Sequence, residues 1–279
     1  MKVLFVNDTS AFHCGSRAVC DVILTGLKTR GHDVRVERSK LEVDLQGVDA
    51  CDAVLVNGEG TLHGNSPRAG RIMQLLEAAQ ALGKGTAICN ASWFDMGNDY
   101  DHVLRRLDRL EVRETRSRDE LRLRHGIGSD IRLDLSYFHP ARGCVGGATP
   151  ARIRMTDLYW PGVRGFARPT GGPLARFEYL EMAQLDWQGM LDHVSASQIL
   201  LTGRHHGVYA ACRARVPFVA LAGNTPKIQG LAAWSGLELP VTENVSELGG
   251  LLARIGRYRP AFEALFDWME GQARWESPF

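Results

Sequence analysis

Short apolar runs alternate with amphipathic stretches along the first half of the chain. Strands that alternate with helices form a parallel sheet with helices on both faces. The pattern therefore predicts a Rossmann-like domain over residues 1–140. The six apolar runs of strand length are Lys2–Asn7, Val34–Val36, Ala53–Asn57, Thr86–Asn90, Leu110–Arg113 and Ile131–Leu133.

Two of the intervening helices carry clear end signals. Ser66 followed by Pro67 is typical of an N-cap and first helical position, and Gly83 ends the apolar helical spacing that follows. Ser117–Glu120 has the spacing of a capping box, and Gly126 is expected to end that helix.

The alternation stops after residue 138 and resumes near residue 175. The stretch between contains five prolines and several glycines, which predicts a linker with irregular structure over residues 141–174. Residues 175–279 then predict a second Rossmann-like domain, closed by a helix at Pro260–Arg274. The expected fold is α/β, with two Rossmann-like domains facing across a cleft in a compact GT-B-like architecture.

Composition narrows the class of protein. The chain has 279 residues, which corresponds to about two domains. It carries 33 basic and 32 acidic residues, so no strong overall field attracts nucleic acid or an acidic membrane. No apolar run is long enough to span a bilayer, and Met1–Ser10 does not resemble a signal peptide. We expect a cytoplasmic protein, with peripheral contact to the inner membrane face as an alternative.

The six cysteines occupy positions 14, 20, 51, 89, 144 and 212 and form no CxxC pair. This spacing indicates reduced cysteines rather than a disulfide framework or a zinc site.

Ligands of open α/β sheets bind beyond the carboxyl ends of the strands, so the loops after the strands are the candidate sites. The loop after the first strand contains no GxGxxG, which argues against a nicotinamide or flavin dinucleotide. Gly15 and Ser16 open a helix and could hold an anion on their amides. A solvated turn with a helix cap is the alternative.

The loop after the third strand reads Asn57-Gly-Glu-Gly-Thr-Leu-His-Gly-Asn65. Gly58 and Gly60 let the backbone approach a ligand, with Asn57 beside it. Glu59 or His63 could serve as general acid or base. The alternative is a glycine turn with exposed polar residues.

The next three strand ends offer an aromatic, a cation and a carboxylate. Trp93 could stack on a sugar or base, or pack at a domain interface. Arg113 could hold a carboxylate or phosphate with two hydrogen bonds. Asp134 could be a nucleophile, a base or an orienting group, or could cap a turn.

The second half contains the strongest candidate, an apolar strand that runs into Gly203-Arg-His-His206 at a helix start. Helix amides, the Arg204 guanidinium and the imidazoles of His205 and His206 together favour an anion. A satisfied helix N-terminus is the alternative, and no spacing indicates a metal. One strand later, Asn224 and Lys227 repeat the arrangement, with Thr225 as expected N-cap and Lys227 as a phosphate partner.

These pieces, in this order, resemble the polysaccharide pyruvyl transferases. The resemblance extends from about residue 54 to residue 235. It lies in Asn57-Gly-Glu-Gly60, Val112-Arg-Glu114, Asp134-Leu-Ser136, Gly203-Arg-His-His206, Val216-Pro-Phe218 and Pro226-Lys-Ile228.

The resemblance implies a GT-B-like fold and transfer of the enolpyruvyl group of phosphoenolpyruvate to a sugar. It implies that Arg204 and His206 contact the donor, with Arg113 as a second anion-binding arginine. The sequence departs from the family at His13-Cys-Gly-Ser16 and at His205.

The resulting hypothesis is a transferase of cell-surface polysaccharide biosynthesis, without a cofactor. Its partners would be phosphoenolpyruvate or a nucleotide-sugar donor and a saccharide or lipid-linked saccharide acceptor. Glu59, His63, Asp134 and His206 are the candidate catalytic residues.

Two alternatives stay open. The first is a retaining glycosyltransferase that uses a nucleotide-activated sugar, for example a CMP-linked ulosonic acid, with Asp134 as nucleophile and Glu59 as acid and base. His139-Pro140 resembles the His-Pro motif of some CMP-sugar transferases. The second is a non-catalytic module that binds an anionic ligand.

Overall fold

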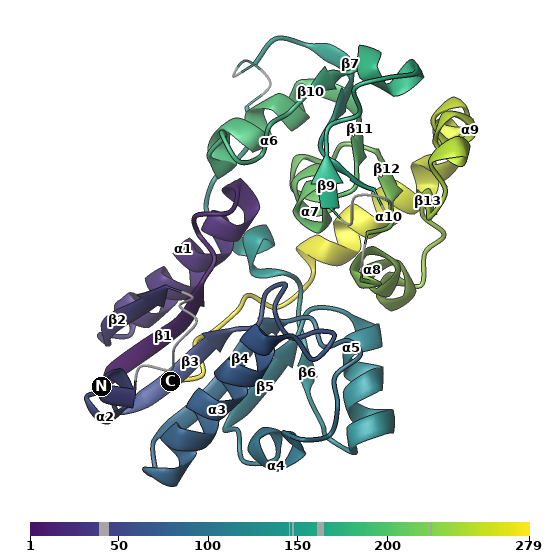
Figure 1. Ribbon diagram of the computed structural model, residues 1–279. Coiled ribbons are helices and arrows are strands. Elements are labelled where there is room, and N and C mark those ends of the chain that lie inside the picture. Colours follow the sequence, from purple (N-terminus) through teal and green to yellow (C-terminus); the bar gives the residue numbers. More distant parts are fainter. Residues whose placement is uncertain (39–44, 145, 147, 161–164, 224) are drawn as a thin grey trace. The chain divides into compact units, whose positions relative to one another are not determined.

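The computed structural model describes residues 1–38, 45–144, 146, 148–160, 165–223 and 225–279 (Figure 1). Contacts within the chain divide it into two units, and neither is continuous in sequence. The first unit comprises Met1–Ala11, Val19–Leu135 and Ala273–Phe279. The second comprises Phe12–Ala18 and Ser136–Gln272.

The first unit is built on a six-stranded parallel sheet with the order β2-β1-β3-β4-β5-β6. All six expected strands are confirmed to within a few residues. Their bounds are β1 (Lys2–Asp8), β2 (Asp33–Arg38), β3 (Ala53–Asn57), β4 (Gly85–Ala91), β5 (Arg109–Val112) and β6 (Asp130–Ile131).

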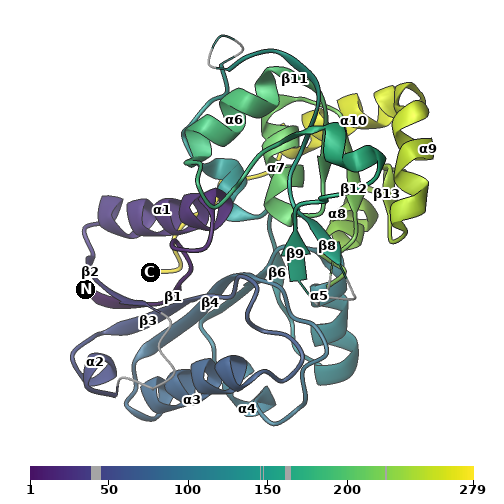
Figure 2. The same cartoon turned by 45° about the horizontal axis from the view of Figure 1, so that its top comes forward.

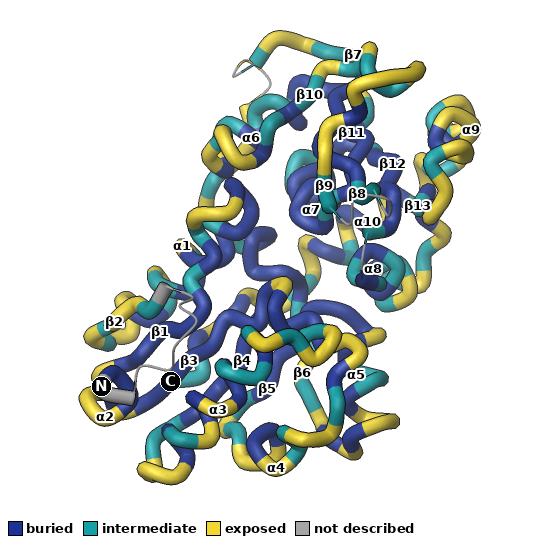
Figure 3. The backbone as a smooth tube through the Cα atoms, in the orientation of Figure 1, coloured by how far each residue is buried: buried dark blue, intermediate teal, exposed yellow. Residues whose placement is uncertain are grey.

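The central strands are buried on both sides, since helices cover both faces (Figure 3). Every residue of β3 is buried. Helices α1 and α3 lie on opposite faces of this sheet (Figures 1 and 2). The helices are α1 (Cys14–Thr29), whose first turn belongs to the second unit, α2 (Leu45–Asp49), α3 (Pro67–Ala81), α4 (Asp101–Leu104) and α5 (Thr115–Glu120), which continues into a π-helical turn at Leu121–His125.

The helix ends agree with the sequence at α3 and differ at α5. Ser66 caps α3 by accepting a hydrogen bond from the Ala69 amide, with Pro67 in the first turn. At α5 the cap is Glu114, whose carboxylate accepts from the amides of Arg116 and Ser117, so the predicted Ser117 capping box was wrong. Gly126 ends the π-helical turn in the left-handed conformation, as expected.

The second unit has a five-stranded parallel sheet with the order β10-β7-β11-β12-β13 and a separate antiparallel pair, β8-β9. In each large sheet, the strand that comes first in the sequence, β1 or β7, occupies the second position. Later strands of the same sheet lie on both sides of it. The bounds are β7 (Ala151–Met155), β8 (Leu158–Trp160), β9 (Gly165–Ala167), β10 (Glu178–Tyr179), β11 (Ser197–Thr202), β12 (Phe218–Leu221) and β13 (Val241–Thr242).

The closing helix of the second unit confirms the predicted amphipathic pattern. Phe262, Leu265, Phe266 and Met269 are buried, and the Phe262 ring lies 5.1 Å from that of Phe218 on β12. The helices are α6 (Trp187–Ser195), α7 (His205–Ala214), α8 (Lys227–Ser235), α9 (Leu248–Ala253) and α10 (Arg259–Glu270), with 3₁₀ turns at Leu135–Phe138, Pro173–Arg176, Val245–Glu247 and Ile255–Tyr258.

The structure differs from the sequence prediction within residues 141–174, which contain β7, β8 and β9 rather than irregular chain alone. The strand β7 is the second strand of its sheet and pairs with both β10 and β11. Two arginines interrupt its apolar residues, and Arg154 is fully buried with its guanidinium donating to the carbonyl oxygens of Thr149 and His193. Because these arginines interrupt the apolar run of β7, the hydrophobic pattern of the sequence did not predict this strand.

All six cysteines are free thiols, and all except Cys144 are buried. Five of them thus occupy buried positions, and the reduced state stays a prediction. Burial raises the pKa of the Cys14 thiol to about 12, because the thiolate would lose its hydration. A thiol with such a pKa is a poor nucleophile at neutral pH.

Candidate functional site

Each unit carries polar residues at its topological switch point, the place where the chain leaves neighbouring parallel strands in opposite directions. In the first sheet this point lies between β1 and β3, and in the second between β7 and β11. Loops that leave two such strands diverge, so a ligand can reach the carboxyl ends of the strands there.

In the first unit, two asparagines join the loops that follow β1 and β3. Asn7 adopts a positive φ of 67°, and its side-chain amide donates to the Asn57 carbonyl at 2.6 Å and to Thr61 Oγ1 at 3.1 Å. Asn57 Nδ2 donates to Thr9 Oγ1 at 3.2 Å, and Asn57 Oδ1 accepts from the Glu59 amide at 3.1 Å. The predicted ligand residue Asn57 therefore holds the loops in place.

Glu59 is buried at the centre of this arrangement, with 6% of its surface exposed. Its Oε2 accepts a hydrogen bond from Thr9 Oγ1 at 2.9 Å. Gly58 precedes it because a side chain there would collide with Ala91, 2.5 Å from an added Cβ, and Gly60 follows with a φ of 60°. Gly58 thus avoids a collision with Ala91, and Gly60 allows the left-handed backbone conformation that follows Glu59.

Arg68, in the first turn of α3, completes the group and was missed from the sequence. Its Nη2 donates to Asn7 Oδ1 at 2.8 Å. Burial lowers the pKa of this guanidinium, and the negative charge of Glu59 opposes that effect. A cation at a helix N-terminus is electrostatically unfavourable, and this signal could have identified Arg68 from the sequence.

His63 lies on the same loop and is partly exposed. Its Nε2 lies 3.1 Å from the carbonyl oxygen of Gly60, and its backbone forms a bridge with Phe94. The acid or base role predicted for His63 stays a prediction.

The Trp93 side chain is buried in the hydrophobic core, whereas stacking on a ligand requires an exposed ring face. It is 1% exposed within the core of the first unit. Its indole nitrogen donates to His125 Nε2 at 3.3 Å, and His125 Nδ1 lies 2.6 Å from Asp101 Oδ1. The side chain that was predicted to bind a ligand is committed to this buried chain of hydrogen bonds.

Arg113 and Asp134, predicted separately as anion site and nucleophile, form one buried ion pair. Arg113 Nη1 donates to Asp134 Oδ2 at 2.5 Å and Arg113 Nε donates to Ser92 Oγ at 2.9 Å. The two side chains are 2% and 0% exposed. This pairing gives both residues a structural function, and their predicted roles in binding and catalysis stay predictions.

In the second unit, Arg204 follows β11 and is the N-cap residue of α7. Its Nε donates to Asp157 Oδ2 at 2.8 Å, and its Nη2 bonds to the same oxygen. The guanidinium carbon lies 4.1 Å from the centre of the Phe166 ring. Its backbone amide donates to Thr202 Oγ1 at 3.0 Å, which fixes the turn between strand and helix.

Asp157 is the second residue that the sequence analysis missed. It follows β7 after one intervening residue, on the opposite side of the switch point from Arg204. Its Oδ1 accepts a hydrogen bond from the Tyr179 hydroxyl. A carboxylate after a strand end is a usable signal, but the strand itself was not predicted.

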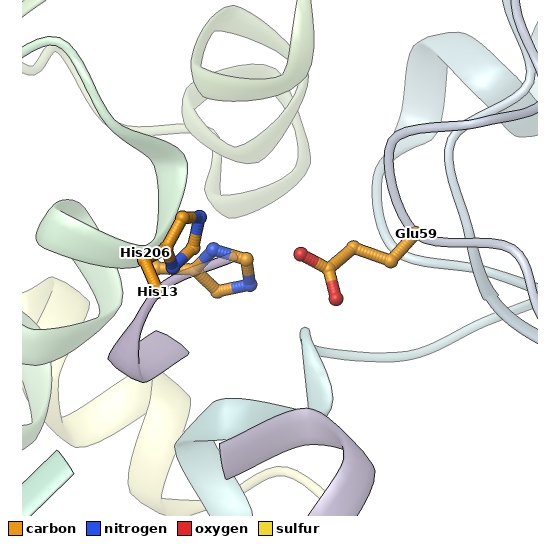
Figure 4. Close-up of side chains that lie close together, drawn as sticks. All are labelled: His13, Glu59 and His206. Carbon is orange, nitrogen blue, oxygen red and sulfur yellow. The ribbon is translucent and has the colours of Figure 1, made fainter. Parts of the chain in front are cut away.

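His206 and His13 pack against each other in the second unit, with ring centres 5.0 Å apart (Figure 4). Gly15 makes this approach possible, since a Cβ added there would lie 2.4 Å from His206 Cβ. The Ser16 amide donates to His13 Nδ1 at 3.3 Å. Gly15 and Ser16 thus contact the histidines of the second unit, and their expected role in anion binding stays a prediction.

His205 begins α7 and is 7% exposed, with its ring centre 4.8 Å from that of Tyr209. His205 and His206 therefore point in different directions from the first turn of the helix, as adjacent helical residues do.

The next strand end carries Lys227, the first residue of α8. The helix is capped by Pro226 and not by Thr225, so that predicted cap was wrong. Among the residues that the structure describes, no partner hydrogen-bonds the buried Thr225 hydroxyl. Asn224 lies outside the described residues.

Within the described part of the chain, no helix combines the length and apolarity needed to cross a bilayer. No protein-family model and no curated protein matches the sequence.

Solved structures share the fold. A UDP-GlcNAc 2-epimerase from Neisseria meningitidis bound to UDP-GlcNAc is 14% identical, with a TM-score of 0.54 over 96% of this chain and 94% of that one. A protein from Listeria monocytogenes assigned as a UDP-N-acetylglucosamine 2-epimerase is 11% identical, with a TM-score of 0.59 over 98% and 91%. The Methanocaldococcus jannaschii UDP-GlcNAc 2-epimerase is 12% identical, with a TM-score of 0.51 over 100% and 96%.

This similarity confirms the α/β class with parallel, Rossmann-like sheets and the GT-B-like fold expected from the sequence. Identities of this size establish the fold alone. Membership of the pyruvyl transferase family and the predicted cleft between two domains stay predictions.

Proposed function

We propose that the protein is a transferase of cell-surface polysaccharide biosynthesis that moves the pyruvyl group of phosphoenolpyruvate to a sugar hydroxyl. The observation that carries the proposal is the placement of Arg204 at the N-terminus of α7, at the switch point of the second sheet. Lys227 begins α8, which follows the adjacent strand β12.

The electrostatics of this strand end favour an anion. The helix dipole places partial positive charge at the N-terminus of α7. Arg204 Nη1 has no hydrogen-bond partner among the described residues, so this nitrogen can donate a hydrogen bond to a ligand oxygen. His206 lies in the same first turn and can hold or move a proton.

The proposed reaction needs groups that move protons. A sugar hydroxyl oxygen bonds to C2 of the enolpyruvyl group, and its proton passes to a base. The CH₂ carbon gains a proton from an acid, for which His206 is the candidate. The oxygen of a second sugar hydroxyl then bonds to C2 as the C2–O bond to the phosphate breaks. The departing phosphate takes the proton of this hydroxyl, which completes the ketal and releases inorganic phosphate.

A ligand panel tests the proposal by thermal stability of the full chain. We expect phosphoenolpyruvate to stabilise the protein, by about 2.7 kcal/mol at a hundred times its dissociation constant. The shift should be lost in Arg204→Gln and kept in Arg176→Gln, since Arg176 is exposed and contacts only the Phe177 ring among the contacts described. No shift with phosphoenolpyruvate in the wild type would contradict the proposal.

A nucleotide-sugar substrate is the second candidate, supported by the fold shared with epimerases solved with UDP-GlcNAc. The same panel therefore includes UDP-GlcNAc, UDP, CMP and GDP. Stabilisation by a nucleotide, without an effect of phosphoenolpyruvate, would favour glycosyl transfer or another sugar-nucleotide reaction. Binding of phosphoenolpyruvate that Glu59→Gln leaves unchanged, without turnover on any saccharide, would favour a non-catalytic binding module.

A further inference from the structure

Arg204 is held on one edge and one face by residues of its own unit. Asp157 Oδ2 accepts from its Nε and Nη2, and Phe166 covers the guanidinium at 4.1 Å. The side chains of Arg204 and Asp157 are 24% and 8% exposed. The cation at the proposed anion site is thus already paired with a carboxylate.

Asp157 is itself fixed and cannot easily turn away. The Tyr179 hydroxyl donates to its Oδ1, and burial together with this bond raises the pKa of Tyr179, so the phenol keeps the proton that it donates. The Asp157 carbonyl accepts from the Gly203 amide at 2.9 Å. A Cβ added at Gly203 would lie 2.9 Å from the same carbonyl oxygen, so the two loops are in close contact.

We infer that Asp157 is a specificity-determining residue that weakens the binding of inorganic phosphate at the N-terminus of α7. A phosphate dianion that accepts from Arg204 Nη1 would share the guanidinium with the Asp157 carboxylate. Two like charges a few ångströms apart repel each other strongly in a partly buried site. Phosphoenolpyruvate is larger than inorganic phosphate and can also contact groups away from Asp157. The repulsion therefore removes a smaller share of its binding free energy.

The inference rests on the proposed function and gives Asp157 a purpose within it. Each pyruvyl transfer releases inorganic phosphate, and the helix N-terminus with Arg204 would otherwise retain this product. A fixed carboxylate therefore favours its departure. Discrimination by a built-in repulsive group is a common route to binding specificity.

Calorimetric titration of the full chain with inorganic phosphate, in chloride buffer of constant ionic strength, tests the inference. We expect Asp157→Asn, which removes the charge and keeps a hydrogen-bonding side chain, to bind phosphate about tenfold more tightly than the wild type. Asp157→Glu keeps the charge and should show no gain. The double variant Asp157→Asn with Arg204→Gln should lose the gain. Phosphoenolpyruvate affinity should rise less than phosphate affinity in Asp157→Asn.

Equal or weaker phosphate binding in Asp157→Asn would overturn the inference, because it would mean that Asp157 only positions Arg204. Asp157→Ser provides a second neutral variant, and circular dichroism melting establishes that each variant is folded. If the wild type binds phosphoenolpyruvate but the neutral variants show no gain for phosphate, this inference alone fails. If phosphate, phosphoenolpyruvate and nucleotides bind to no variant, the proposed function fails with it.

Discussion

Charged side chains at the strand ends are mostly paired, and the pairs differ in how much water reaches them. Arg113 and Asp134 are both fully buried, whereas Arg204 keeps about a quarter of its side chain exposed. Desolvation makes a buried ion pair expensive to break, because removing one partner leaves an uncompensated charge. At the residue scale, Arg113 and Asp134 therefore serve stability, and Arg204 retains an edge for a ligand.

We predict that Asp134→Asn lowers the free energy of unfolding by about 3–5 kcal/mol, because Arg113 would keep its charge without a partner. Urea denaturation measures this change. Asp119→Asn is the matched control: its ion pair with Arg118 is 39% exposed on both sides and should contribute about 0–1 kcal/mol. An Asp134→Asn variant as stable as the wild type but without activity would instead favour Asp134 as the nucleophile.

A helix begins where a nearby side chain accepts hydrogen bonds from the first backbone amides. The start of a helix can therefore be predicted from a short stretch of sequence. Ser66 confirms it for α3. The exceptions are α8, whose N-cap residue is Pro226 rather than Thr225, and α5, where Glu114 takes the cap three residues before the predicted Ser117. Burial raises the pKa of the Glu114 carboxyl, although the amides of Ser117 and Arg116 oppose this effect. The preferred N-cap residues are serine, threonine, aspartate and asparagine, so these preferences do not predict Glu114 as a cap.

At the scale of the element, we predict that Ser66→Ala costs about 1 kcal/mol of stability through loss of the bond to the Ala69 amide. Ser66→Gly should cost only a few tenths of a kcal/mol, since glycine leaves that amide open to water. Thermal or urea unfolding distinguishes the two. An unchanged stability in Ser66→Ala would mean that the cap contributes little to α3.

Each unit consists of more than one segment of the chain, so a single boundary in the sequence does not separate the two units. Residues Phe12–Ala18 belong to the second unit and Ala273–Phe279 to the first. Within the first unit, the Trp275 indole donates to Glu111 Oε2 at 2.8 Å and its ring lies against Gly26 of α1. The sequence-based boundaries at residues 140 and 174 are continuous and could not represent this arrangement.

For the whole molecule, we predict that Trp275→Ala destabilises the first unit by about 3–5 kcal/mol, as for other buried tryptophans. Hydrogen exchange should increase in β5 and the end of α1 and stay unchanged in β11 and β12. Trp268→Ala is the matched control, because Trp268 packs against Trp234 in the second unit. Increased exchange in β11 and β12 after Trp275→Ala would contradict the assignment of this segment to the first unit.

The alternation of apolar runs and amphipathic stretches was sufficient to predict the first parallel sheet, the α/β class of the second unit, the closing helix and the loops that carry Glu59 and Arg204. These features depend on neighbours a few residues apart, and the physical rules for strands, caps and turns are local. Only the tertiary structure decided the pairings. Arg113 meets Asp134 across 21 residues, Trp93 meets His125 across 32 and Arg204 meets Asp157 across 47. Such partners are chosen by strand order and by the need to neutralise charge away from water, and neither leaves a local pattern in the sequence.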